Sequence, residues 1–241
     1  HDAAREARVI LSGEHRAAAR TAAQRSIVLL KNEGDVLPVA KGAQKIAVVG
    51  ALADDALSQL GSWRAQGRAE DVVTLRAALE AAHHNVVFAP GTDARTDDVT
   101  DIPEAVAAAE SSDLIVLALG EDYDWSGEAR SRSSLELPGR QLALFEALAA
   151  TGKPLVVVLM GGRPLAIPEV AEKADAVLEC WYAGQEGGTA IAEALLGKIN
   201  PGAKLPVTVV RNAGQIPAFY NHKPSARRGY LFDDKTPLFP F

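Results

Sequence analysis

The sequence predicts an α/β domain with a largely parallel, six-stranded sheet covered by helices on both faces, that is, an α/β sandwich. Two observations support this prediction. Short, near-continuous apolar runs recur along the chain, as expected for strands of a parallel sheet that is buried on both faces. Alanine- and leucine-rich segments of helical length lie between these runs, and such alternation is typical of parallel sheets whose right-handed crossovers place helices on both faces.

The predicted strands are the apolar runs, several of which stop at a glycine. The run at 113–120, Asp-Leu-Ile-Val-Leu-Ala-Leu-Gly, is the clearest, and the run at 154–160 closely resembles it. Near-continuous apolar runs of this length are expected for strands of a parallel sheet that is covered on both faces. The full set of predicted strands is 45–50, 85–88, 113–120, 154–160, 176–181 and 205–210.

The predicted helices lie before and between these strands and carry ordinary capping residues. Asp101 and Pro103 mark the start of one helix, while Gly152 and Gly197 follow the ends of two others. Aspartate is favoured at the N-cap, proline in the first turn and glycine just after the last turn. The full set of predicted helices is 14–31, 72–83, 102–111, 140–150 and 185–196.

Composition excludes several classes of function. The 241 residues carry a formal net charge of −6, so we expect neither nucleic acid nor an anionic membrane surface as a partner. Cys180 is the single cysteine, which rules out an internal disulfide and any zinc site built on several thiolates. No apolar run approaches the roughly 20 residues that span a bilayer. Because the chain starts at His1 and its one methionine is Met160, we expect it to be a piece of a longer protein.

Motifs for metals and nucleotides are incomplete. Residues 93–104 place acidic side chains at several positions of a calcium loop, but Arg95 falls at the third position, where a ligand is required. Gly50 follows a predicted strand without the further glycines of a dinucleotide-binding fingerprint. We therefore predict no metal site and no cofactor.

Two long loops at the carboxyl ends of predicted strands carry most of the chemistry. Ligands of such sheets bind at this edge. The loop at 121–138 combines acidic residues with Tyr123, Trp125 and two arginines, and the loop at 51–70 contributes Trp63. Carboxylates beside aromatic rings suit carbohydrates, because rings stack on sugar faces and carboxyl groups bind hydroxyls or move protons. The pattern favours a sugar site.

A series of motifs in a fixed order gives the sequence a family resemblance. Two of them are Ser-Gly-Glu-Ala-Arg-Ser-Arg at 126–132 and Ala-Gly-Gln-Glu-Gly-Gly at 183–188. The others lie at 24–33, 37–38, 46–50, 53–55, 61–63, 117–121, 137–139, 152–154, 162–166, 200–206, 215–217 and 220–222. Together they make the chain resemble the C-terminal α/β sandwich domain of family 3 glycoside hydrolases, the β-glucosidase and β-xylosidase type.

The resemblance implies a division of the chain and of the enzyme. Residues 1–33 are expected to be a helical link from an N-terminal barrel domain, residues 34–211 the sandwich, and residues 212–241 a wrap or link toward a further domain. The barrel would supply the nucleophilic aspartate in a Ser-Asp-Trp-like motif, which this sequence does not contain. The resemblance also favours a periplasmic or secreted enzyme and allows a homo-oligomer.

The resemblance also implies roles for individual residues. Glu128 matches the acid/base carboxylate, with Glu121 and Asp124 as the next candidates. Some members of the family use a histidine of the barrel or a loop of a neighbouring subunit instead. Trp63 matches an aromatic residue that flanks the sugar cleft. The predicted substrate-binding residues are Trp63, Glu121, Asp124, Trp125 and Arg132.

We therefore predict the second domain of a retaining β-glycosidase, specifically a β-glucosidase acting on a β-glucoside or related oligosaccharide. The reaction would be a double displacement between two carboxyl groups about 5–5.5 Å apart, only one of which this chain supplies. The alternative is a non-catalytic carbohydrate-binding or scaffolding module, because a fold does not fix a function. A nucleotide-binding α/β domain is a weaker third hypothesis.

Overall fold

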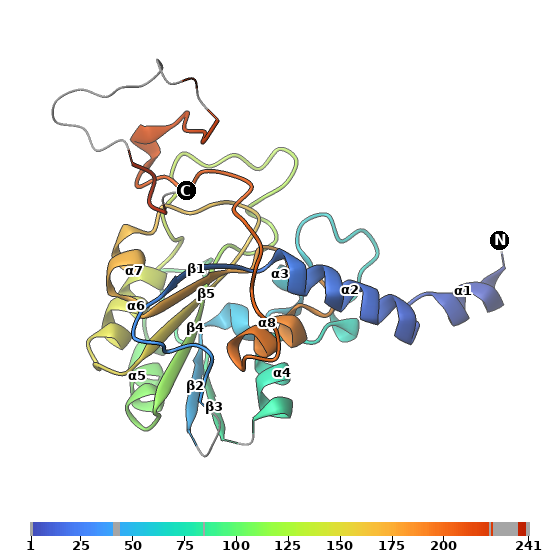
Figure 1. Cartoon of the computed structure of the whole chain (residues 1–241), viewed down its shortest axis with the longest axis horizontal. Helices are drawn as coiled ribbons and strands as arrows, with labels where there is room; N and C mark the ends of the chain where they lie inside the picture. The colour runs from blue at the N-terminus through green and yellow to red at the C-terminus, as the bar shows by residue number, and fades with distance from the viewer. Residues whose placement is uncertain (1, 41–43, 84, 222, 224–235, 240–241) are drawn as a thin grey trace.

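The computed structural model describes residues 2–40, 44–83, 85–221, 223 and 236–239, and contains one six-stranded mixed sheet. The strands lie side by side in the order β1-β6-β5-β4-β2-β3 (Figure 1). Their bounds are β1 Val28–Asn32, β2 Ile46–Val49, β3 Val86–Ala89, β4 Leu114–Gly120, β5 Leu155–Met160 and β6 Ala176–Glu179.

The sheet is parallel except at one edge. Strands β2 to β6 pair in parallel, whereas β1 pairs antiparallel with β6. Every residue of the central strands β4 and β5 is buried, as the apolar runs predict for a sheet covered on both faces. The predicted fold class is confirmed.

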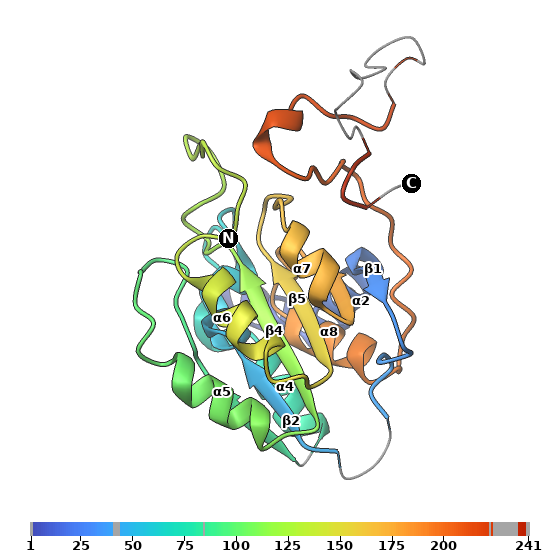
Figure 2. The ribbon, with the colours of Figure 1, turned by 90° about the vertical axis from the view of Figure 1, so that its left-hand side faces the viewer.

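Helices cover both faces of the sheet (Figure 2). One layer, which includes α2 (Gly13–Ser26), α4 (Leu75–Ala82) and α8 (Gly187–Leu195), buries side chains such as Leu79 and Ile191 against the sheet. The opposite layer contains α5 (Ile102–Glu110), α6 (Gln141–Ala149) and α7 (Pro168–Lys173), with Phe145 in its core. The sheet therefore lies between two hydrophobic cores. The chemically rich loops lie outside these cores, at the edges of the sheet.

The sixth strand is not the one that we predicted from the sequence. Residues 205–210 form no strand, whereas Val28–Asn32, which we had expected to continue the helix at 14–31, is β1. The helix stops at Ser26 because Leu29 and Leu30 pack against the two opposite cores, which requires the alternating side chains of a strand. Strand β1 occupies the position next to β6, so residues 205–210 could join the sheet only on the outer side of β1. Pro206 has no backbone N–H to donate to the hydrogen bonds of such a strand pair.

The other predicted helices agree with the structure to within three residues at each end. Three short helices had no clear sequence signal: α1 (Ala3–Val9), α3 (Ala56–Leu60) and α7. The sheet starts at Val28, inside the segment 1–33 that we expected to be a helical link. In the tail, Leu238 and Phe239 pack against the core that contains Phe145, while 222, 224–235 and 240–241 of the predicted wrap lie outside the described residues.

Ion pairs and a hydrogen bond connect side chains of α2 to carboxylates on and next to α8. Arg20 and Gln24 bind the carboxylate of Glu193, and Arg16 donates to Glu186 at 2.6 Å. The hydrogen bond from Arg20 is the main cause of the lowered pKa of Glu193.

Helix α1 has no buried residue and extends away from the sheet (Figure 1). Within the described part of the chain, no helix has the length and apolar character needed to cross a membrane.

Candidate active site

The two chemically rich loops meet at the carboxyl edge of the sheet. After β2, the chain forms a short 3-10 helix (Ala51–Asp54) and then α3, whose first turn is capped when Asp55 accepts a hydrogen bond from the Ser58 amide at 3.0 Å. The Ser58 hydroxyl in turn lies 3.3 Å from the amide nitrogen of Tyr123 and accepts its hydrogen bond. A capped helix therefore supports the start of the loop that follows β4.

The side chain of Gln141 ties the two ends of the loop at 121–138 together. Its amide nitrogen donates to the carbonyl oxygens of Gly120 at 2.8 Å and Pro138 at 3.0 Å, and its carbonyl oxygen accepts from the Gly120 amide at 2.9 Å. Gln141 is buried. A buried side chain with three such bonds fixes the base of the loop at the end of the central strand.

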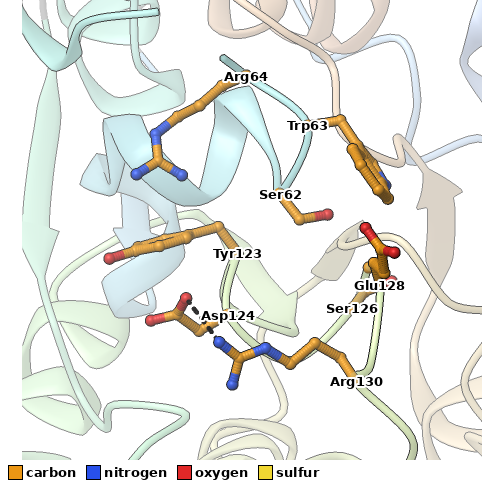
Figure 3. Close-up of a pocket in the computed structure, with 9 residues that line it drawn as sticks. Ser62, Trp63, Arg64, Tyr123, Asp124, Ser126, Glu128 and Arg130 are labelled. Carbon is orange, nitrogen blue, oxygen red and sulfur yellow. Dashed lines mark ion pairs between the residues drawn. The ribbon is translucent and has the colours of Figure 1, made fainter. Parts of the chain in front are cut away.

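An open pocket of about 270 Å³ lies between the loops at 51–70 and 121–138 (Figure 3). The Trp63 ring and the Glu128 carboxylate face the same space. The Trp63 side chain is 73% exposed, so it does not belong to either core. The lining residues are Ser62, Trp63, Arg64, Tyr123, Asp124, Ser126, Gly127, Glu128 and Arg130.

Charges of both signs surround this pocket. Arg130 lies 4.0 Å from the carboxylate of Asp124, and the guanidinium of Arg64 stacks 4.4 Å from the ring centre of Tyr123. Arg95 approaches the same ring at 5.4 Å and forms an ion pair with the buried Asp122. Contacts with these two guanidinium groups hold the Tyr123 ring in place. Asp124 and Glu128 are exposed and remain open to a ligand.

Two glycines allow the loops to approach closely. A Cβ atom on Gly127, whose φ is +127°, would lie 3.1 Å from both Cβ and Oγ of Ser62. A Cβ atom on Gly61, whose φ is +86°, would meet the Tyr182 ring at 2.5 Å. Larger residues at these positions would be strained and would push the loops apart. Burial raises the pKa of Tyr182, whose ring lies against Gly61.

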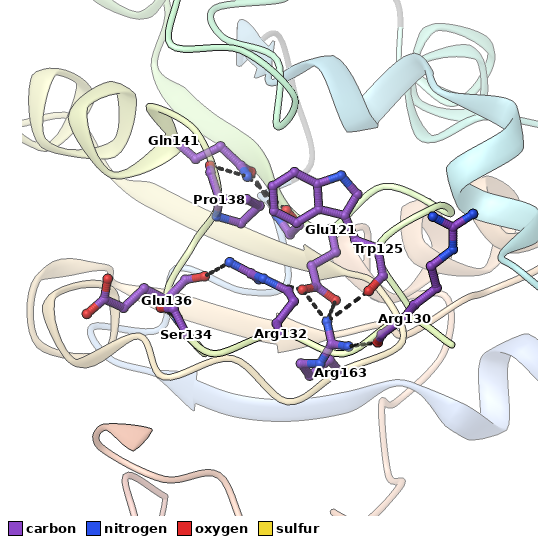
Figure 4. A network of polar contacts seen from close by, with 10 residues as sticks. Glu121, Trp125, Arg130, Arg132, Ser134, Glu136, Pro138, Gln141 and Arg163 are labelled. Atoms are coloured by element: carbon purple, nitrogen blue, oxygen red, sulfur yellow. Dashed lines mark hydrogen bonds and ion pairs between the residues drawn. The ribbon is translucent and has the colours of Figure 1, made fainter. Parts of the chain in front are cut away.

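The structure separates the six predicted site residues into two groups. Trp63, Asp124 and Glu128 line the pocket together. The other three form a cluster beside it: Glu121, which is fully buried, Arg132, and Trp125, whose ring lies 4.8 Å from the Arg132 guanidinium. Glu121 does not reach the pocket because Arg132 and Arg163 engage its carboxylate at 2.5 and 2.6 Å (Figure 4).

Sequence reasoning missed three residues that shape this site, namely Gln141, Arg163 and Tyr182. Gln141 stands at the start of a predicted helix, where a polar residue is unremarkable. Arg163 and Tyr182 follow predicted strands, so their places at the carboxyl edge of the sheet were an available signal. Arg163 also lies in the motif at 162–166, which was used for the family resemblance but given no role at the site. In the described residues, no group of three or more His, Cys, Asp or Glu side chains could hold a metal ion.

Residues 27–241 match the family model for the glycosyl hydrolase family 3 C-terminal domain. The chain belongs to this family. The match covers the whole sheet and both loops of the pocket. It confirms the resemblance drawn from the ordered motifs.

Relatives of this family 3 domain include glucosidases and xylosidases. A periplasmic beta-glucosidase of Salmonella typhimurium is 41% identical over 94% of this chain, and a beta-xylosidase of Formosa agariphila is 37% identical over 95%. Among solved structures, the beta-glucosidase of Listeria innocua in complex with isofagomine is 37% identical over 96% of this chain, with a TM-score of 0.88. A mutant of that enzyme was solved with laminaribiose.

The family 3 domain spans about a third of each relative. It covers 34% of the Salmonella protein, 33% of the Formosa protein and 34% of the Listeria chain. The relatives thus contain some two thirds of their length outside the region that this chain matches.

Proposed function

We propose that the chain is the second domain of a retaining β-glucosidase, in which Glu128 is the acid/base and Trp63 forms one wall of the sugar cleft. The observation that carries the proposal is that Glu128 and Trp63, from loops that follow different strands, line one pocket. The beta-glucosidases among the relatives support glucose as the sugar. The open pocket is small for a complete ligand site, which fits a cleft closed by a second domain.

The proposed reaction is a double displacement at the anomeric carbon. A carboxylate of the N-terminal barrel attacks that carbon while protonated Glu128 gives its proton to the departing glycosidic oxygen. Glu128, now a carboxylate, then takes a proton from water, which displaces the enzyme carboxylate and restores the original configuration. Asp124 is exposed at the pocket, and we assign it hydrogen bonds to sugar or aglycone hydroxyls.

The full-length enzyme should hydrolyse aryl β-glucosides with retention and prefer them over aryl β-xylosides. The two sugars differ by one hydroxymethyl group, so the ratio of kcat/KM values should be on the order of 10-fold or more. Proton NMR of the first-formed sugar gives the configuration, and initial rates give the preference. Inversion would contradict the mechanism, whereas a preference for the xyloside would reassign the enzyme as a β-xylosidase and leave the mechanism intact.

The Trp63→Ala variant should weaken substrate binding without lowering stability much. The ring is 73% exposed, so its loss removes a stacking surface worth on the order of 1 kcal/mol, about a fivefold rise in KM. The melting temperature and the Michaelis constant of the full-length enzyme are the two measurements. Val99→Ala, at an exposed apolar residue that does not line the pocket, is the control and should change neither. A large loss of stability with unchanged KM would show that Trp63 supports the fold instead.

A further inference from the structure

Arg163, in the loop that follows β5, contacts both ends of the turn that carries Glu128. Its Nη1 atom donates to the carbonyl oxygen of Trp125 at 3.1 Å, and its Nη2 atom donates to that of Arg130 at 3.0 Å (Figure 4). Glu128 lies between these two residues in the sequence. A single guanidinium group thus holds the two ends of the turn.

The turn is closed by one backbone hydrogen bond and contains one residue in an unfavourable conformation. The amide of Arg130 donates to the carbonyl oxygen of Gly127 at 3.2 Å, and Ala129 has a φ of +59°, which is unfavourable for a residue with a Cβ atom. Glu128 is exposed. A strained turn keeps one shape only when its surroundings impose it, and Arg163 supplies such a constraint at both ends.

The carboxylate of Glu121 binds Arg163 directly, and Arg132 binds the same carboxylate. Nη1 of Arg163 lies 2.6 and 2.8 Å from the two carboxylate oxygens of Glu121, which is fully buried, and Arg132 binds one of the same oxygens at 2.5 Å. Arg132 also donates to the carbonyl oxygen of Glu136 at 3.2 Å. The buried carboxylate is compensated by charge and hydrogen bonds, so it serves as an anchor for the guanidinium group.

We propose that Arg163 is a positioning residue for Glu128, acting through the carbonyl groups of Trp125 and Arg130, with Glu121 as its anchor. The inference rests on the acid/base role proposed for Glu128. In this proposal, Glu121 and Arg132 support the turn through Arg163. The sequence had predicted that these two residues bind substrate. Lysine cannot replace Arg163, because its ammonium group lacks the planar fork that reaches several acceptors at once.

The test is a double-mutant cycle in the full-length enzyme with Arg163→Lys, Glu128→Ala and the double variant. The substrates are an alkyl β-glucoside, which needs acid catalysis, and a dinitrophenyl β-glucoside, which does not. We expect Arg163→Lys to lower kcat/KM, which reports formation of the glycosyl-enzyme, about 100-fold on the alkyl glucoside, as small displacements of a catalytic group do. The same substitution should leave kcat/KM on the dinitrophenyl glucoside within a few-fold. In the Glu128→Ala background, Arg163→Lys should cause no further loss, because residues that act as one unit are not additive.

Arg20→Lys is the matched control. Arg20, on α2, also binds a poorly exposed carboxylate, that of Glu193 on α8. Its replacement should change the rates on both substrates by the same factor. Arg163→Gln, which keeps donors without the charge, is the second variant if Arg163→Lys is unstable in a thermal melt.

Equal losses on both substrates, or multiplied losses in the double variant, would overturn the positioning role while leaving Glu128 as the acid/base. If Glu128→Ala itself does not discriminate between the substrates, the proposed function fails, and the inference fails with it.

Discussion

Replacing Glu128 with alanine in the full-length enzyme should slow hydrolysis of alkyl β-glucosides by about 10²- to 10⁴-fold, the usual contribution of a positioned general acid. Dinitrophenyl glucosides should form the glycosyl-enzyme at a nearly normal rate, because their leaving group departs without protonation. Values of kcat/KM, from initial rates well below KM, measure the difference between the two substrate types. The exposed carboxylate in the pocket is the structural reason for the expectation.

Azide provides a second measurement on the same variant. Without a general base to activate water, the glycosyl-enzyme should accumulate, and added azide should restore turnover of the dinitrophenyl glucoside. The product should be a glycosyl azide of retained configuration. Asp124→Ala is the matched control in the same pocket, and azide should not accelerate it. If Glu128→Ala slows both substrates equally without azide rescue, the acid lies elsewhere, and Asp124, a barrel histidine or a neighbouring subunit becomes the candidate.

The second large effect concerns stability, and its source is Glu179 at the end of β6. This side chain is buried, and burial raises its pKa from 4.5 to about 8. Its carboxyl group accepts a hydrogen bond from the Trp181 amide at 3.2 Å. The folded state therefore favours the neutral acid, whereas the unfolded chain ionises at the ordinary pKa.

The sign of the pH dependence follows from that difference. A raised folded pKa gives stability that is fully present below pH 4.5 and is lost as the pH rises through about 8. The shift corresponds to a loss on the order of 4–5 kcal/mol between these limits. Glu179→Gln keeps a neutral acceptor for Trp181 and should remove this loss, so the variant should be more stable than the parent at pH 8 and similar at pH 4.5.

Denaturant unfolding of both proteins at several pH values tests this expectation, since the difference between them isolates one carboxyl group. Glu172→Gln, at an exposed residue on α7, should leave the pH profile unchanged. A parallel profile for the Glu179→Gln variant and the parent would show that Glu179 keeps its ordinary pKa in the folded state.

The fold could be predicted from the sequence to a large extent. A strand buried on both faces is mostly apolar, so β2, β4, β5 and β6 are visible as runs in the sequence, although β6 ends in the buried Glu179. The edge strand β1 was not, because its residues also suit a helix and only contact with the two cores selects the extended form. Edge strands depend on their neighbours more than on their own propensity.

The candidate site was also predictable in its chemistry, but not in its arrangement. The sequence by itself determined which loops carry the carboxylates and rings, because the carboxyl ends of parallel strands must share one edge. Only the tertiary structure decided that Glu128 and Trp63 share a pocket while Glu121 is buried beside it. The physical reason is that an isolated carboxylate is costly to bury, and Glu121 becomes buried only because Arg132 and Arg163, the latter from the loop after another strand, neutralise it.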